Sequence, residues 1–188
     1  MRAKTYLMSG ALLLCGAAHS FDFKGLVLGD LATTDAVESA LAYCGPTSDR
    51  KCEPYQLRMN VKCGAGENNW QICNGITTVA GNAARVNLVI NGEGVIQRIA
   101  LSDISSRAFG DISEQLKTKF GKPRTQKQSA VQNGFGAVFE QTELVWSNAK
   151  RHRVEFIEYD GSIDNSSLYF GIPQDRQQIA RPRKKGDL

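Results

Sequence analysis

The chain has 188 residues, of which 41% are hydrophobic, with 23 basic residues against 19 acidic ones. This length suits a single domain that can bury a core of its own. The near balance of charge excludes the general electrostatic attraction to nucleic acid that a strongly basic domain has.

Residues 1–20 have the three-part layout of a secretory signal peptide. A short basic end with Arg2 and Lys4 precedes an uncharged apolar run, and small residues precede an expected cleavage site between Ser20 and Phe21. The apolar run is too short for a transmembrane anchor, which needs about 20 apolar residues. Cleavage would also remove Arg2 and Lys4, which brings the mature chain closer still to charge balance. We therefore expect a periplasmic or secreted protein.

Four cysteines remain after the signal peptide is removed, namely Cys44, Cys52, Cys63 and Cys73. An even number of cysteines in an exported chain predicts a disulfide framework. Three pairings are open, and the spacing favours two local loops, Cys44–Cys52 and Cys63–Cys73. Zinc is the alternative use, but the close Cys-x-x-Cys pairs that suit chelation are missing. Each bridge would contribute about 2–4 kcal/mol, mainly by restricting the unfolded chain.

The first half of the mature chain predicts one helix and a set of strands. Residues 21–29 are typical of a short strand or an extended lead-in. A helix capped by Thr34 or Asp35 is expected to end near Cys44, where Gly45 and Pro46 stop it. Alternating apolar and polar residues, and an Asn-Gly turn at 91–92, predict strands and a hairpin over residues 55–62, 76–79, 84–90 and 95–101.

The second half repeats this outline. A helix should begin near Ser105 or Asp111 and end at Phe120, before Gly121. Strands are then expected over residues 129–132, 137–146, 151–159 and 167–170. Runs of strands after each helix exclude a parallel α/β sheet. We predict an α+β fold with an antiparallel sheet or meander, both helices packed on one face, and two similar α-β halves. Residues 21–172 form this domain, and residues 173–188 form a basic, flexible tail.

The sequence contains no recognisable catalytic constellation, and it predicts no metal and no cofactor. His152 is the one histidine of the mature chain and is expected to be an ordinary strand residue. Glu140 and Glu143, and likewise Glu155 and Glu158, are three residues apart on predicted strands. Odd spacing puts the two members of each pair on opposite faces. Convergence of carboxylates across strands stays open.

Two features are candidate contacts with a partner. Trp70 lies in a polar loop inside the second predicted disulfide, where an exposed aromatic suits a protein contact and packing is the alternative. The chain end is basic, and its charge suits either a solvated tail or contact with anionic lipid or polymer. The basic residues concerned are Arg181, Arg183, Lys184 and Lys185.

The layout resembles that of a group of small exported bacterial proteins. The resemblance is carried by Phe21-x-Phe23-x-Gly25-x-x-x-Gly29, the hairpin around Asn91-Gly92, and Phe120-Gly121-Lys122-Pro123. The helix-plus-meander plan is similar to the β-lactamase-inhibitor-like and outer-membrane-assembly lipoprotein folds. This chain departs from the lipoproteins because Leu14 precedes Cys15, where lipidation needs a small residue. The resemblance implies binding without catalysis and names no partner.

These observations favour a non-catalytic, exported protein-binding module, an inhibitor or an accessory factor of the cell envelope. The partner is expected to be another envelope protein, with no role for nucleic acid. One alternative is a small envelope hydrolase that uses carboxylates from neighbouring strands. The other is a binder of anionic surfaces through the basic tail.

Intact-mass analysis of the purified exported protein should show a chain that begins at Phe21. Alkylation without reduction should add no mass, because Cys44, Cys52, Cys63 and Cys73 are expected to be oxidised. Four free thiols, or a chain that still begins at Met1, would contradict the predicted export.

Overall fold

The computed structural model describes residues 20–41, 62–66 and 69–173, and the description below is confined to them. Its helical elements are α1 (Thr34–Ala40), the short 3-10 helix η2 (Ser106–Ala108) and α3 (Phe109–Phe120). None of the helices in these ranges is long and apolar enough to cross a bilayer. A small hairpin is made of β1 (Asp22–Phe23) and β2 (Leu26–Val27).

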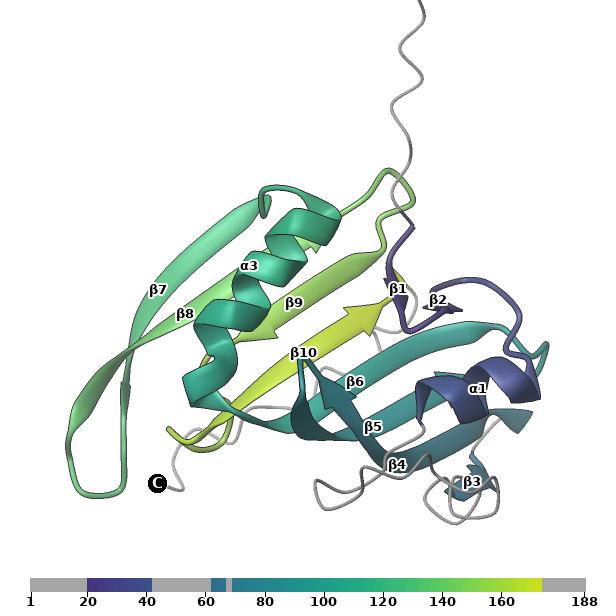
Figure 1. The fold of residues 1–188 in the computed structure, drawn as a ribbon, viewed down its shortest axis with the longest axis horizontal. Helices are drawn as coiled ribbons and strands as arrows, with labels where there is room; N and C mark the ends of the chain where they lie inside the picture. The colour runs from purple at the N-terminus through teal and green to yellow at the C-terminus, as the bar shows by residue number, and fades with distance from the viewer. Residues whose placement is uncertain (1–19, 42–61, 67–68, 174–188) are drawn as a thin grey trace, which may run out of the picture.

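The other strands form one antiparallel sheet of eight strands, which confirms the α+β class (Figure 1). In chain order they are β3 (Lys62–Ala65), β4 (Gln71–Val79), β5 (Asn82–Ile90), β6 (Ile96–Ser105), β7 (Thr125–Gln132), β8 (Val138–Ser147), β9 (Arg153–Ile157) and β10 (Asn165–Gly171). Their order in the sheet is β3-β4-β5-β6-β10-β9-β8-β7. Four of these strands follow α1 and four follow α3, and the last strand of each set pairs with the other at the centre.

Burial alternates along the strands because one face of the sheet packs under the helices. At the central seam, Ile99 lies opposite Phe170 and Leu101 lies opposite Leu168, and all four side chains are buried. Both helices lie over this same face (Figure 1). They add buried residues to a single hydrophobic cluster, among them Val37, Ala40, Ile112 and Leu116.

The predicted helices are present, with shifted starts. The cap of α1 is Thr33 and not Thr34 or Asp35, because the Thr33 hydroxyl accepts a hydrogen bond from the Ala36 amide. The helix ends at Ala40, earlier than predicted. The end of α3 at Phe120 is confirmed, since Gly121 adopts a φ of 80°. Glycine tolerates this left-handed conformation best.

Most predicted strands are present, and several are longer than predicted. β4 begins at Gln71 and β7 begins at Thr125, several residues before the apolar positions that suggested them. Pairing of the backbone with β5 and β8 extends these strands through polar residues. The hairpin around Asn91 is confirmed. Of the predicted strand 55–62, only Lys62 lies within the described residues.

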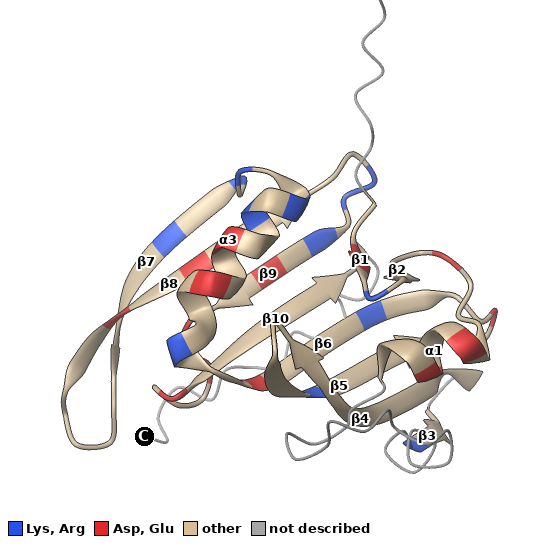
Figure 2. Cartoon of the chain, in the orientation of Figure 1, with Lys and Arg blue, Asp and Glu red and all other residues tan. Residues whose placement is uncertain are grey.

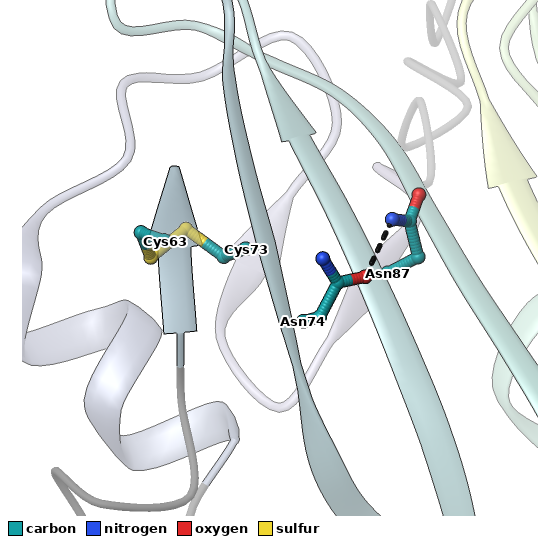
Figure 3. The surroundings of a disulfide bond; sticks show 4 residues. All are labelled: Cys63, Cys73, Asn74 and Asn87. Carbon is teal, nitrogen blue, oxygen red and sulfur yellow. Dashed lines mark hydrogen bonds between the residues drawn. A yellow bond between two sulfur atoms is a disulfide. The ribbon is translucent and has the colours of Figure 1, made fainter. Parts of the chain in front are cut away.

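One predicted disulfide is present in the described residues. Cys63 of β3 and Cys73 of β4 lie directly opposite each other and are bonded (Figure 3). On the next pair of strands, the Asn87 side-chain amide donates to Asn74 Oδ1 at 2.8 Å (Figure 3). The Cys63–Cys73 disulfide therefore holds the edge strand β3 covalently to the sheet. Cys44 and Cys52 lie outside the described residues.

A buried hydroxyl joins three elements near the end of α1. Thr77 of β4 is fully buried, and its Oγ1 donates to the Ala40 carbonyl at 2.8 Å. The same oxygen accepts from Lys24 Nζ, which lies in the β1–β2 turn, at 3.0 Å. Thr77 thus connects the sheet, the helix and the N-terminal hairpin.

Thr77→Val should lower the free energy of unfolding by about 1–3 kcal/mol, because the buried Ala40 carbonyl loses its donor while the side-chain volume stays similar. Thr78→Val is the matched control, since Thr78 only accepts from Lys24 at a more exposed site. That control should cost within about 0.5 kcal/mol. Urea denaturation of both variants measures the difference. Equal stabilities would show that the Thr77 contact contributes nothing.

Candidate functional site

The face of the sheet turned away from the helices is called the open face here. The register places a row of side chains across its centre, one from each of five adjacent strands. From β4 to β9 this row reads Asn74, Asn87, Ala100, Tyr169 and Glu155. All except Asn74 are partly buried between their neighbours. The open face therefore presents polar and aromatic groups on strands that are paired on both sides.

A β-bulge interrupts the seam between β6 and β10. Ser102 and Asp103 of β6 together face the single residue Ser167 of β10. Asp103 has a φ of 58°, in the left-handed region that aspartate tolerates better than most residues. Arg85 of β5 holds the Asp103 carboxylate through its Nε at 2.8 Å. Bulges of this kind bend a strand and re-aim its side chains, often beside functional sites.

A hollow of about 530 Å³ lies on the open face beside the bulge. Its volume falls in the range of small-molecule binding sites, roughly 300–1,000 Å³. It is lined by Ala100, Leu101, Ser102, Arg153, Glu155, Ile157, Asp160, Ser167, Leu168 and Tyr169. Small side chains from the seam form its base, so the bulge and these small residues together create the space.

The ring of Tyr169 is positioned by a glycine. A Cβ atom on Gly171 would overlap the Tyr169 ring and its hydroxyl, so only glycine leaves room for the ring at this place. The ring consequently lies along β10 toward Gly171 and away from Ser167. This orientation leaves the space above Ser167 open and gives the hollow one aromatic wall.

A cluster of three charged side chains borders the hollow. Arg153 Nη2 of β9 donates to Glu155 Oε2 at 2.8 Å and to Glu143 Oε1 of β8 at 3.3 Å. The three side chains are between 23% and 27% exposed. Acidic and basic positions accordingly adjoin on β8 and β9 (Figure 2). Two of the four glutamates considered in the sequence thus converge across strands.

The other two glutamates stay apart from this cluster. Glu158 Oε2 accepts a hydrogen bond from the Thr142 amide at 3.0 Å. Glu140 is opposite Ala130 in the β7–β8 ladder. It is three residues from Glu143 and so points to the other face. Odd spacing separates Glu140 from Glu143 within β8, whereas Glu158 lies beyond the end of β9. The convergence of Glu143 with Glu155 depends on pairing that the sequence did not reveal.

The environment of Glu155 changes its proton affinity. Burial raises the pKa of Glu155 above its ordinary value of 4.5, the Arg153 guanidinium opposes that rise, and a hydrogen bond and repulsion from Glu143 add to it. Glu155 consequently holds a proton more readily than an ordinary glutamate. A protonated carboxyl beside a second carboxyl can donate a hydrogen bond as well as accept one.

Two residues considered in the sequence lie elsewhere. His152 precedes β9, and its ring lies against Gly29. Burial lowers the pKa of His152, with Lys150 adding to the effect and Asp30 opposing it. Trp70 is half-buried just before β4, and its carbonyl accepts from the Gly66 amide at 2.6 Å. The four basic tail residues lie outside the described ranges.

An exposed aromatic residue was missed in the sequence. Phe135 is 99% exposed at the turn between β7 and β8, and Val138 beside it is 66% exposed. Asn133 Oδ1 accepts from the amides of Phe135 and Ala137 at 3.0 and 2.9 Å, which makes the turn well defined. The tip between Lys127 and Glu140 carries no charge (Figure 2). The sequence signal that could have indicated this exposed residue is an apolar residue inside an Asn-Gly-x-Gly turn.

The β7–β8 hairpin reaches beyond the helix that covers it (Figure 1). At the usual helical rise, α3 (Phe109–Phe120) is about 18 Å long. At the usual rise of an antiparallel strand, β7 (Thr125–Gln132) is about 27 Å long. The outer part of the hairpin is therefore not covered by α3, and Phe135 stands at its end.

No group of three potential metal ligands among histidine, cysteine, aspartate and glutamate occurs in the described ranges. Comparison with family models, curated proteins and solved structures finds no match to this chain. Its function is accordingly inferred from the geometry of the open face and the hairpin tip.

Glu155→Gln should change how stability depends on pH. A raised pKa in the folded state means that the folded protein binds the extra proton. The contribution of Glu155 is therefore full below about pH 4.5 and is lost as pH rises through the folded-state pKa. Because glutamine cannot lose a proton, the variant should gain in stability relative to the parent protein as pH rises from 4 to 8. Urea denaturation across that range tests this, and a constant difference would contradict it.

Proposed function

We propose that this protein is a non-catalytic binding module of the cell envelope that contacts another protein through the open face of its sheet. The observation that carries the proposal is the set of side chains at the centre of this face. Tyr169 and Arg153 lie on this face, and so does Arg98, whose Nη2 donates to Asn87 Oδ1 at 3.3 Å. All three are of the two types, tyrosine and arginine, that are most enriched among interface hot spots together with tryptophan. All three belong to central strands of the sheet, so they are held in place before a partner arrives.

The two faces of the sheet suit different tasks. The helix-covered face buries the apolar core and offers no free surface at its centre. The open face combines a hollow with a polar rim, which is the usual anatomy of a contact pocket. The expected export and the Cys63–Cys73 disulfide fit a module that works outside the cytoplasm. Within the envelope, such a module would serve as an inhibitor or as an accessory factor.

The hairpin tip supplies a second contact. An exposed phenylalanine on a hydrogen-bonded turn loses little conformational freedom when a partner covers it. An aromatic side chain buries about 150–250 Å² on contact, enough to anchor one edge of an interface. The nearby Val138 would enlarge the apolar area.

A hydrolase is the second candidate, and the raised pKa of Glu155 beside Glu143 favours it, because acid–base pairs are tuned in this way. Geometry places it second. Retaining and inverting glycosidases hold their carboxyls about 5–9.5 Å apart around the bond to be cleaved, whereas here one guanidinium, that of Arg153, contacts both carboxyls. Turnover of peptidoglycan or glycan fragments that disappears in Glu155→Gln would favour the hydrolase.

Affinity capture from an envelope extract, with the purified tagged protein as bait, tests the binding proposal. Ser102→Trp should abolish capture of the partner, because the bulky ring fills the hollow from an exposed position. Phe135→Ala should weaken it about 30-fold, the effect of losing a hot spot of about 2 kcal/mol.

Two matched controls separate site effects from general ones. Gln115→Trp adds the same ring to an exposed position of α3, which covers the other face of the sheet, and Leu31→Ala removes another exposed apolar side chain. Both controls should capture the partner like the parent protein. Capture that is unaffected by Ser102→Trp would rule out the open face as the contact surface.

A further inference from the structure

The hollow has both apolar and charged groups in its lining. Its base is formed by Ala100, Ser102 and Ser167, and Ile157 and the Tyr169 ring provide apolar walls. The Glu155 carboxyl lies at one side of this space, and Asp160 lies at another. A ligand that fits must therefore combine an apolar stem with a polar end.

The charges around the hollow are mainly negative. Two carboxylates, Glu155 and Asp160, line it together with one guanidinium, that of Arg153. This guanidinium is already shared, because Nη2 contacts both Glu155 and Glu143. Lys127 lies opposite Glu143 in the β7–β8 ladder but does not line the hollow. A ligand entering the hollow thus meets more negative than positive charge.

We infer that the hollow receives the side chain of an arginine or a lysine from the partner protein, an inference that rests on the proposed function. An aliphatic stem would lie against Ile157 and the small residues of the base. The cationic end would reach the Glu155 carboxyl, in the way that long basic side chains bury their stems and keep their charge near polar groups.

Other classes of side chain fit less well. An aspartate or glutamate would be repelled by the carboxylates of the lining. A neutral apolar side chain would fit the apolar walls but would gain no attraction from the two carboxylates of the lining. A cation would gain that attraction, and against the Tyr169 ring it would also be attracted by the negative face of the aromatic system.

Amide resonances of the purified, disulfide-bonded protein, followed by two-dimensional NMR, report binding of small probes. N-acetyl-arginine amide and N-acetyl-lysine amide represent the proposed side chains, and N-acetyl-norleucine amide is the neutral control of similar length. At least one cationic probe should shift the amides of Ser102, Ile157 and Ser167 at millimolar concentration. It should bind about tenfold more tightly than the norleucine probe, as expected for one partly desolvated cation contact.

Variants of the protein test whether the cationic probe binds in the hollow. Glu155→Gln should weaken the cationic probe about tenfold, and Ser102→Trp should abolish its binding. Glu140→Gln is the matched control, since it removes a carboxylate on the other face of β8, and it should leave binding unchanged. The dispersion of the amide spectrum shows whether each variant is folded.

Equal binding of the norleucine probe, no binding of either cation, shifts confined to other parts of the sheet, or an unchanged affinity in Glu155→Gln would each overturn the inference. The proposed function is tested by a different experiment: it would be contradicted if Ser102→Trp still captured the envelope partner. Loss of capture in Ser102→Trp together with no preference for cations would leave the binding face in place and exclude a basic side chain as its occupant.

Discussion

The pairing of β6 with β10 at the centre of the sheet is the contact on which the rest of the structure depends. It joins strands that are far apart in the chain, so closing the intervening segment costs conformational entropy before any contact is gained. Burial of facing residues such as Ile99 and Phe170 offsets that cost. Without this pairing, two four-stranded sheets would each expose an edge at the seam. With it, both helices share one core.

Local features of the fold were predictable because they are determined by neighbours in the chain. The hairpin at Asn91 depends on a turn from Asn91 to Gly94, where Gly94 has a positive φ, and the end of α3 depends on Gly121. The start of β7 was missed because polar residues there follow β8 through backbone pairing and show no alternation. The cap of α1 moved to Thr33 because several adjacent polar residues were plausible caps.

Most of the candidate site could not be predicted from the sequence, because it depends on how distant strands pair. The hollow needs the bulge at Asp103, and the charged cluster needs the registers of β8, β9 and β10, none of which leaves a local pattern. Arg153 and Glu155 are neighbours on one face of β9, and only the pairing of β8 with β9 brings Glu143 to them. Phe135 is the exception, since an apolar residue inside an Asn-Gly turn is visible in the sequence.

The composition of the seam is easier to explain by binding than by stability. Larger apolar residues at Ala100 and Ser167 would bury more surface, at about 25 cal/mol per Å², and would close the hollow. A partly buried pair of carboxyls around one guanidinium contributes little net stability, because desolvation opposes the attraction. Gly171 similarly gives up side-chain packing to make room for the Tyr169 ring. The small residues of the seam, the charged cluster and Gly171 thus each contribute less stability than they could. All three lie together on a face that no helix covers in the described part of the chain. The shape and charge of this face are those expected if, as proposed, a partner protein binds there.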